Sequence, residues 1–278
     1  MLRASMLVIG DEILGGFVTD TNSPWCADRL RAHGVPLDRV SVVPDEHAAI
    51  GEALAAELAR ERPRVVVTSG GIGSTPDDLT YEAVARALGR EVVEDASIVR
   101  ELSRAVAWSE ERGLGMSEEA VWHLNRMARI PAGSRLLRRE SGWTPAVCVD
   151  VDGGSDGGGV TVVVLPGVPR EFRALIGEVV EPELLAGRNT IPAVVELTHG
   201  FPESVLNLTF VELAARHPDV KLGSYPGRPM IVRLTGAREE VEAAAAFVRG
   251  ALEALEGGPG GAEVAADWQH RGTDDPTA

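Results

Sequence analysis

The chain has 278 residues, of which 44% are hydrophobic and 25% are charged, and its formal net charge is −15. These proportions are those of a folded globular protein, and the length allows a large domain followed by a small one. The negative charge argues against nucleic-acid partners, which are bound mainly through Lys and Arg. We find neither a membrane-spanning apolar stretch nor a recognisable signal peptide, so we expect a cytoplasmic protein without a membrane partner.

The first part of the chain alternates between strand and helix patterns. Apolar, partly β-branched runs predict strands at 6–10, 37–43 and 64–68. A helix is predicted after each strand, and Ser23 and Asp45 are expected to open the first two helices. Repeated units of this kind predict an α/β fold in which a mostly parallel sheet has helices on both faces, a three-layer α/β/α architecture.

The pattern continues to about residue 186. Helices are predicted at 96–112 and 117–127, and a pair of strands at 146–151 and 160–165, joined by a glycine-rich hairpin loop. A proline-glycine turn at 166–169 then leads into a helix that ends near Leu185. Residues 1–186 are therefore expected to form the large domain.

A second, smaller domain is predicted from residue 190 to residue 256, after a boundary at 187–190. Its expected strands are at 193–198 and 230–235, and its expected helices are at 203–216 and 239–255, which makes a small α+β unit. From 257 to 278 the chain is rich in Gly, Pro, Asp and Thr, and we expect a disordered tail there.

Residues 70–80, which we call the glycine loop, contain the strongest local motif. The loop directly follows the third predicted strand and leads into a helix. Gly70, Gly71 and Gly73 allow the backbone to approach a ligand closely, so that N–H groups can surround an anion. Glycines alone would fit a tight turn equally well.

Two adjacent carboxylates, Asp77 and Asp78, favour a binding site over a simple turn. Carboxylates beside a phosphate are explained by a divalent cation that lies between them and the ligand, although one of the two is also expected to cap the helix. The loop lacks the Gly-Lys-Ser/Thr of a Walker A sequence. Pro76 stands where a dinucleotide-binding fingerprint has its third glycine.

A second candidate loop follows the first predicted strand. Gly10 is succeeded by Asp11 and Glu12, which are candidates for metal ligands or a general base. Asp20 and Asn22, further along, are either ligand contacts or helix caps, and the cap is favoured for Asp20.

The proline-glycine turn is the third candidate. Gly167 lies in the turn, Arg170 is a possible phosphate contact and Glu171 a possible metal ligand, but a rigid turn with a glutamate in the first helical turn explains them equally well or better. All three loops follow strands. Because ligands of parallel sheets bind at the carboxyl ends of the strands, the loops are expected to meet there.

Taken in order, Gly10-Asp11-Glu12-Ile13-Leu14, the glycine loop and Leu165-Pro166-Gly167-Val168-Pro169 resemble the N-terminal domain of the CinA family, which has the MoaB/MogA-like molybdopterin-binding fold. The resemblance covers about residues 5–186. Residues 203–204 and 222–226 resemble the small KH-like domain that follows in CinA proteins. Full-length members continue into an amidohydrolase domain that deamidates nicotinamide mononucleotide. The sequence stops before it, so deamidase activity is not expected.

The resemblance implies a small-molecule partner, a nucleotide or pterin phosphate, and a divalent metal (Mg²⁺, Mn²⁺ or Co²⁺) as cofactor. It implies Asp11, Glu12, Asp77 and Asp78 as catalytic residues, with Asp11, Asp77 and Asp78 as metal ligands. The implied ligand-binding residues are Gly10, Asn22, Gly70, Gly71, Gly73, Ser74, Thr75 and Gly167. Relatives on this fold form dimers or trimers, so a homo-oligomer is expected.

The sequence departs from the family pattern at three positions. Ser74 stands where proline is common, Phe172 where methionine is common, and Ala146 where glycine is usual, which weakens the expectation that the turn before Ala146 touches a ligand. The KH-like segment has no Gly-x-x-Gly loop with basic flanks, so RNA binding is not expected.

Three functions follow from the resemblance. The favoured one is metal-dependent hydrolysis of a nucleotide pyrophosphate of the ADP-ribose or FAD class. The second is molybdopterin binding or adenylyl transfer in molybdenum cofactor biosynthesis, and the third is a non-catalytic nucleotide- or pterin-binding module. All three use the same loop, and the sequence does not separate them.

Overall fold

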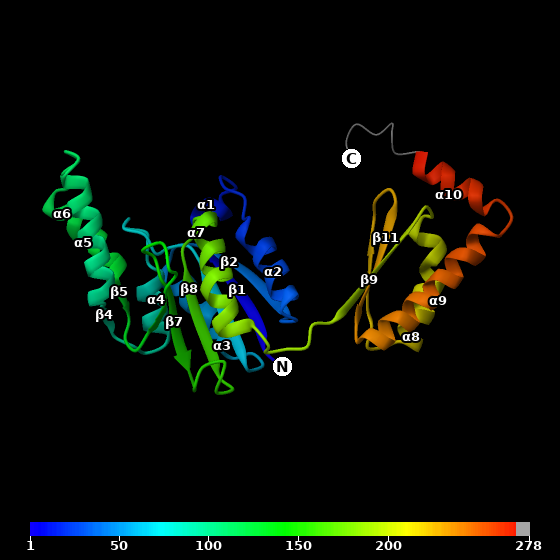
Figure 1. Ribbon diagram of the computed structural model, residues 1–278, viewed down its shortest axis with the longest axis horizontal. Helices are drawn as coiled ribbons and strands as arrows, with labels where there is room; N and C mark the ends of the chain where they lie inside the picture. The colour runs from blue at the N-terminus through cyan, green and yellow to red at the C-terminus, as the bar shows by residue number, and fades with distance from the viewer. Residues whose placement is uncertain (271–278) are drawn as a thin grey trace. The chain divides into compact units, whose positions relative to one another are not determined.

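The computed structural model describes residues 1–270 (Figure 1). The chain divides into two compact units, one that ends at Ile191 and one that begins at Pro192. The sequence placed the boundary at 187–190, a few residues earlier. Within the described part, no helix combines the length and the apolar character that crossing a membrane requires.

The first unit is built on a six-stranded sheet, and its first four strands in spatial order are parallel. The order is β2-β1-β3-β8-β7-β6, and β7 and β6 are antiparallel to their neighbours. The strands are β1 (Arg3–Ile9), β2 (Leu37–Val43), β3 (Arg64–Ser69), β6 (Arg135–Leu137), β7 (Ala146–Val151) and β8 (Val160–Leu165). This confirms an α/β fold with a mostly parallel sheet.

Strand register brings the ends of the parallel strands level with one another. Val8 in β1 pairs with Val42 in β2 and with Ser69 in β3, and Ser69 in turn pairs with Leu165 in β8. The loops that follow these four strands therefore leave the sheet along a single edge, as expected for ligand-binding parallel sheets.

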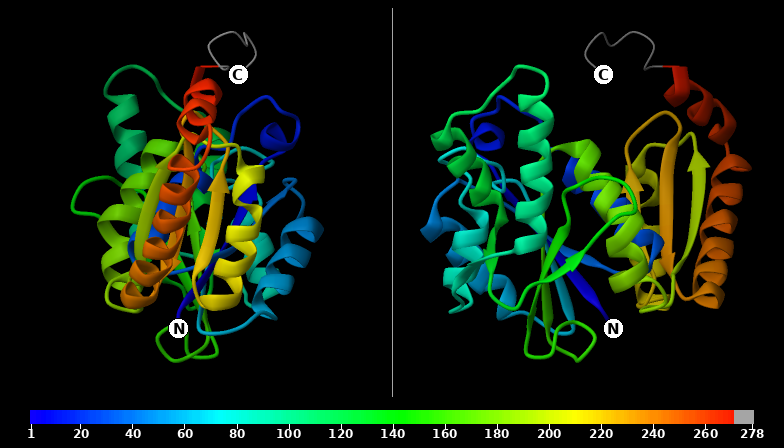
Figure 2. Two further views of the ribbon diagram at one scale, coloured as in Figure 1. Left: turned by 90° about the vertical axis from the view of Figure 1, so that its right-hand side faces the viewer. Right: turned by 60° about the vertical axis from the view of Figure 1, so that its left-hand side comes forward.

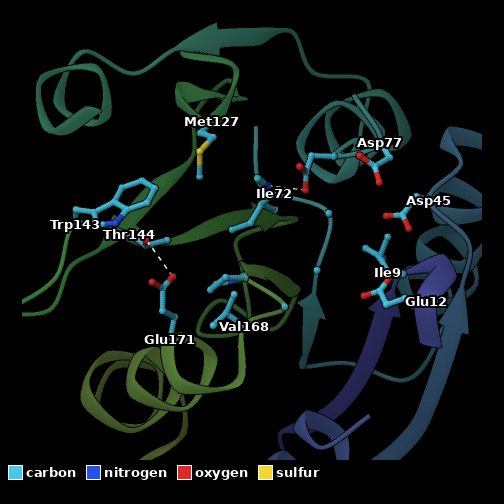
Figure 3. Close-up of a pocket in the computed structure, with 17 residues that line it drawn as sticks. Ile9, Glu12, Asp45, Ile72, Asp77, Met127, Trp143, Thr144, Val168 and Glu171 are labelled. Atoms are coloured by element: carbon cyan, nitrogen blue, oxygen red, sulfur yellow. Dashed lines mark hydrogen bonds between the residues drawn. The ribbon is translucent and has the colours of Figure 1, made fainter. Parts of the chain in front are cut away.

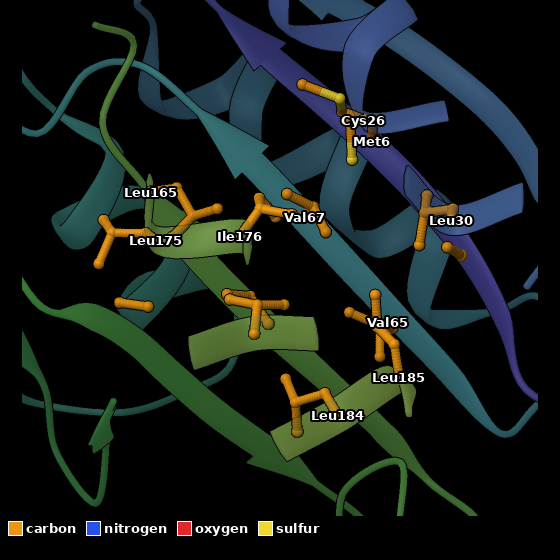
Figure 4. Packing of buried hydrophobic residues seen from close by; sticks show 14 of the residues in the cluster. Met6, Cys26, Leu30, Val65, Val67, Leu165, Leu175, Ile176, Leu184 and Leu185 are labelled. Atoms are coloured by element: carbon orange, nitrogen blue, oxygen red, sulfur yellow. The ribbon is translucent and has the colours of Figure 1, made fainter. Parts of the chain in front are cut away.

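Successive side chains of a strand point to opposite faces of the sheet, and here both sets are apolar. Helices cover both faces and bury them. Val65 and Val67 of β3 pack in one cluster with Leu30 and Leu175, and Figure 4 shows this core. Val66, between them, packs in a second cluster on the other face. The helices of the first unit are α1 (Asp11–Leu14), α2 (Asn22–Ala32), α3 (His47–Leu58), α4 (Thr80–Ala87), α5 (Ala96–Glu110), α6 (Glu118–Asn125), η1 (Arg126–Ala128), α7 (Pro169–Leu175) and the π-helix η2 (Ile176–Leu185).

The second unit contains a three-stranded antiparallel sheet in the order β10-β11-β9. Helix α9 packs against β9 and β11 (Figure 2) and buries residues at helical spacing, among them Val241, Ala245 and Val248. The elements are β9 (Ala193–His199), η3 (Glu203–Leu206), α8 (Asn207–Arg216), β10 (Lys221–Tyr225), β11 (Met230–Gly236), α9 (Arg238–Glu256) and α10 (Gly261–His270).

Several sequence-based expectations are corrected here. We did not predict β10, nor the three-residue strands β4 (Val92–Glu94), β5 (Arg129–Pro131) and β6, which are too short to show a period. The expected disordered tail is helical in α10, whose apolar residues our composition argument overlooked. The rest of that tail, 271–278, lies outside the described residues.

Two helix starts were also predicted wrongly. Ser23 lies inside α2, whose N-cap residue is Thr21. The carboxylate of Asp20, one residue earlier, accepts hydrogen bonds from the backbone N–H groups of Asn22 and Ser23. Asp45 does not cap α3, which begins at His47. Its carboxylate instead accepts a hydrogen bond of 2.9 Å from the backbone N–H of Asp11.

Candidate functional site

Glycines allow three strand-end loops to pack against one another. Gly70 has a φ of 109°, and a Cβ atom there would overlap the carbonyl oxygen of Ile9. A Cβ on Gly167 would lie 3.2 Å from the Cα of Gly70. The side-chain amide of Asn22 donates to Ser69 Oγ (2.9 Å) and to the carbonyl oxygen of Gly167 (2.8 Å), which ties the ends of β3 and β8 together.

Asp78 holds the glycine loop in shape. Its carboxylate accepts hydrogen bonds from the backbone N–H groups of Gly73 (2.6 Å) and Thr75 (2.8 Å) and from the Thr75 hydroxyl (2.6 Å). Arg126 donates to the carbonyl oxygens of Thr75 and Asp78 from outside the loop. The expected helix cap is not formed, because α4 begins after Leu79 without a side-chain cap, and Asp78 instead closes the loop that precedes the helix.

A pocket of about 590 Å³ opens where the loops meet, and three carboxylates line one side of it (Figure 3). We call Glu12, Asp45 and Asp77 the acidic wall. Glu12 lies in α1, which directly follows β1, and Asp45 and Asp77 come from the loops after β2 and β3. No ion pair joins any of them to a residue of the described part.

Two members of the acidic wall have shifted pKa values. Burial, together with the negative charges of Asp11, Glu12 and Asp77, raises the pKa of Asp45 above the ordinary aspartate value, although the hydrogen bond from Asp11 opposes the shift. Hydrogen bonding to Thr75 lowers the pKa of Asp77. Asp45 therefore ionises against the repulsion of its neighbours, and that repulsion would be relieved by a bound cation.

The side of the pocket opposite the acidic wall is largely apolar. Met127, Trp143 and Val168 line it, and Figure 3 shows the Trp143 ring facing the pocket. The carboxylate of Glu171 accepts a hydrogen bond of 3.4 Å from the hydroxyl of Thr144 on this side. The arrangement offers a flat surface for a ring at one end of the pocket and backbone N–H groups with carboxylates at the other.

The structure places most, but not all, of the expected site residues at the pocket. Those that line it are Gly10, Glu12, Gly70, Gly71, Gly73, Asp77, Asp78 and Gly167. Asp11, Asn22, Ser74 and Thr75 do not line it: Asn22 and Thr75 support the loops, as described above. Among the described residues there is no group of three or more His, Cys, Asp or Glu side chains that could hold a metal ion, so the expected trio of Asp11, Asp77 and Asp78 is not brought together.

Sequence reasoning missed Asp45, Met127 and Thr144. Asp45 follows β2, a parallel strand, so the rule that identified the other loops could also have identified it. Met127 lies in the short helix η1 and Thr144 in the loop before β7, and neither belongs to a motif. Trp143 is exposed over 38% of its surface and lies at the pocket.

Together, the fold and the site define an α/β protein with a glycine loop and carboxylates at the carboxyl edge of a parallel sheet. A family model described as "Probable molybdopterin binding domain" matches residues 5–186. The chain belongs to this molybdopterin-binding domain family.

The chain is also similar to individual proteins over most of its length. The chain is 37% identical over 231 residues to a CinA-like protein of Myxococcus xanthus, which covers 80% of this chain and 51% of the relative. The chain thus spans about half the length of that relative. It is 34% identical over 265 residues to a protein of Aeropyrum pernix, with 92% and 93% covered. Among solved structures, CinA from Thermoplasma acidophilum, described as of unknown function, superposes with a TM-score of 0.51 at 30% identity and covers 63% of this chain and 94% of that one.

Proposed function

We propose that this pocket binds a nucleotide pyrophosphate of the ADP-ribose or FAD class together with a divalent cation, and hydrolyses it. The observation that carries the proposal is the pairing of the glycine loop with the acidic wall. The loop offers backbone N–H groups to a phosphate, but no Lys or Arg lines the pocket among the described residues. A pyrophosphate would meet the negative charges of Glu12, Asp45 and Asp77 unless a cation bound with it.

The donor set fits a cation that arrives on the substrate. Mg²⁺ is usually held by one or two carboxylates together with water and substrate phosphates, so it does not need three protein ligands gathered in advance. Asp45 and Asp77 are the residues that would hold it. When bound, the cation would neutralise phosphate charge and acidify an attacking water.

The chain's own residues have distinct tasks in this proposal. The backbone of Gly71 orients one phosphate, and Asp78 keeps the loop in position by accepting hydrogen bonds from the N–H groups of Gly73 and Thr75. The Glu12 side chain folds back over Gly10: both Glu12 carboxylate oxygens lie 2.8 Å from the position that a Cβ atom would take at Gly10. There it can accept a proton from a water molecule as a general base.

A second candidate, molybdopterin binding or adenylyl transfer, is favoured by the description of the family and by the flat apolar side at Trp143. One experiment separates the candidates. The purified protein is incubated with ADP-ribose, with FAD, and with ATP plus molybdopterin, in Mg²⁺, Mn²⁺ or Co²⁺ and in chelator. Metal-dependent release of AMP from ADP-ribose or FAD supports hydrolysis, and adenylylated pterin supports the second candidate. Binding without turnover of any of them leaves a non-catalytic module.

Variants connect the result to the pocket. Asp77→Asn should lower the rate of AMP release by at least about tenfold, because it removes a charge that would hold the cation. Glu46→Gln removes a charge of the same sign from an exposed residue next to Asp45 and outside the pocket, so its rate should match wild type. Equal rates in all three proteins would remove the acidic wall from the reaction.

A further inference from the structure

A second pocket, of about 550 Å³, adjoins the first one, and two arginines line it. We call it the arginine pocket. Trp143, Val168 and Glu171 line both pockets and form the partition between them. Arg139 and Arg170 line the second pocket alone, so guanidinium groups are found only there, although Glu171 contributes a carboxylate to both pockets.

Arg139 is mostly buried and poorly paired. Its side chain is only 13% exposed, and its Nη1 atom lies 3.8 Å from the carboxylate of Glu178, which is too far for a hydrogen bond. Its Nε atom is buried and has no hydrogen-bond partner in the described part of the chain. A buried guanidinium N–H without an acceptor is unfavourable, and an anion bound to this side chain would offset that cost.

The backbone is shaped around this arginine. Gly142 has a φ of 101°, and a Cβ atom there would overlap Nη2 of Arg139. Glycine at residue 142 therefore lets the loop that carries Trp143 lie directly on the guanidinium without displacing it. Arg170, exposed in the first turn of α7, adds a second positive charge and has no ion-pair partner among the described residues.

We propose that the arginine pocket binds a second anionic group, a phosphate, of the same ligand whose pyrophosphate lies on the glycine loop. This deepens the proposed function, on which it rests: the substrate class becomes a nucleotide pyrophosphate that carries a further phosphate. Such a ligand crosses the partition at Trp143. The cation-bound phosphates face the acidic wall, and the phosphate without a cation meets the planar, bidentate donors of Arg139.

The test compares nucleotides that have no pyrophosphate to cleave. Calorimetry in Mg²⁺ measures the dissociation constants of AMP, adenosine 2′,5′-bisphosphate and adenosine 3′,5′-bisphosphate. At least one bisphosphate should bind wild type about tenfold more tightly than AMP does, the gain expected of one charge-assisted contact. Arg139→Gln and Arg170→Gln should lose that gain and keep the AMP affinity. Arg139→Lys should keep only part of that gain, because lysine has the positive charge but not the planar, bidentate donors of a guanidinium.

The control is Arg104→Gln, which removes the same charge from a side chain that is 73% exposed on α5 and should keep the full gain. Because Arg170 is exposed, its variant keeps the test valid if Arg139→Gln does not fold. Equal affinities for AMP and both bisphosphates in wild type, or a gain that survives in both Gln variants, would overturn the proposal. If inorganic phosphate bound to the protein together with a bisphosphate, a phosphate site would still be empty, which would contradict the claim that one ligand occupies both sites.

Failure of the proposed function gives a different result. If AMP does not bind wild type, the phosphate site on the glycine loop is wrong. Inorganic phosphate titrated alone then decides the arginine pocket separately: binding that Arg139→Gln abolishes and Arg104→Gln retains would support the anion subsite, and no such binding would overturn it.

Discussion

The two ends of the parallel sheet handle charge in opposite ways. At the amino end, Arg64 and Glu57 are almost fully buried, and Arg64 forms an ion pair of 2.7 Å with Asp38. Ser5 donates to Glu57 and accepts from Arg64, so the charges there are joined by hydrogen bonds. At the carboxyl end, the acidic wall has no basic partner among the described residues.

The contrast separates a structural use of charge from a functional one. Charged side chains that are paired within the chain hold elements together and leave no unpaired charge to bind a ligand. Burial and the neighbouring carboxylates raise the pKa of Asp45, so its charge is retained at the expense of stability. Changes at the amino end should therefore alter stability, and changes at the carboxyl end should alter binding.

The largest effect is expected from Arg64→Met. It leaves Glu57 and Asp38 without their buried partner, which should lower the free energy of unfolding by about 3–5 kcal/mol. Arg104→Met, on the exposed i,i+3 pair of α5, should cost less than about 1 kcal/mol. Urea titration measures both variants. Similar losses of unfolding free energy in the two variants would contradict the claim that the buried charges at the amino end stabilise the fold.

An intermediate effect is expected at the glycine loop. In Gly70→Ala, a new Cβ meets the carbonyl oxygen of Ile9 in addition to the strain of a positive φ. Gly16→Ala is the matched control, because Gly16 has a φ of 72° but no atom lies within 4 Å of the position that a Cβ would take there. Gly16→Ala should cost about 1 kcal/mol. Gly70→Ala should cost roughly 1–3 kcal/mol more and abolish nucleotide binding. Intact binding in Gly70→Ala would contradict the close packing of the three loops.

The smallest change in stability is expected for Asp45→Asn, and it should be an increase. A carboxyl whose pKa is raised on folding destabilises the folded state above that pKa, and the effect disappears as the pH falls and the group is protonated in both states. The melting temperature in chelator should rise by roughly 1–2 °C at neutral pH, and the difference should vanish in acid. Cation-dependent nucleotide binding should meanwhile weaken. A lower melting temperature at neutral pH would show that repulsion does not dominate at Asp45.

The sequence predicts the strands whose residues show a clear local pattern, and misses those that do not. The strands β2, β3 and β8 were predicted to within one residue and a mostly parallel sheet was expected, whereas β1 begins three residues before its predicted start. The three-residue strands and β10 were not predicted, since their pairing is set by tertiary contacts. In the site, motif residues such as Gly70 and Asp77 line the pocket, and their roles in binding and catalysis stay predictions.

Side-chain direction could not be read from the motif. Asp11 and Glu12 are neighbours in sequence, but only Glu12 lines the pocket. Asp77 and Asp78 looked equivalent, yet Asp78 turns back to bind the N–H groups of Gly73 and Thr75. Asp45 was assigned to a helix start because an aspartate before a helix is usually a cap.

The central claim, that the acidic wall and a phosphate are joined by a cation, can be measured directly with a ligand that is not cleaved. Calorimetric titration of α,β-methylene-ADP into the protein, with Mg²⁺ and with chelator, compares the two dissociation constants. We predict binding at least about tenfold tighter with Mg²⁺, and loss of that difference in Asp77→Asn. Equal affinity in Mg²⁺ and in chelator would contradict the claim.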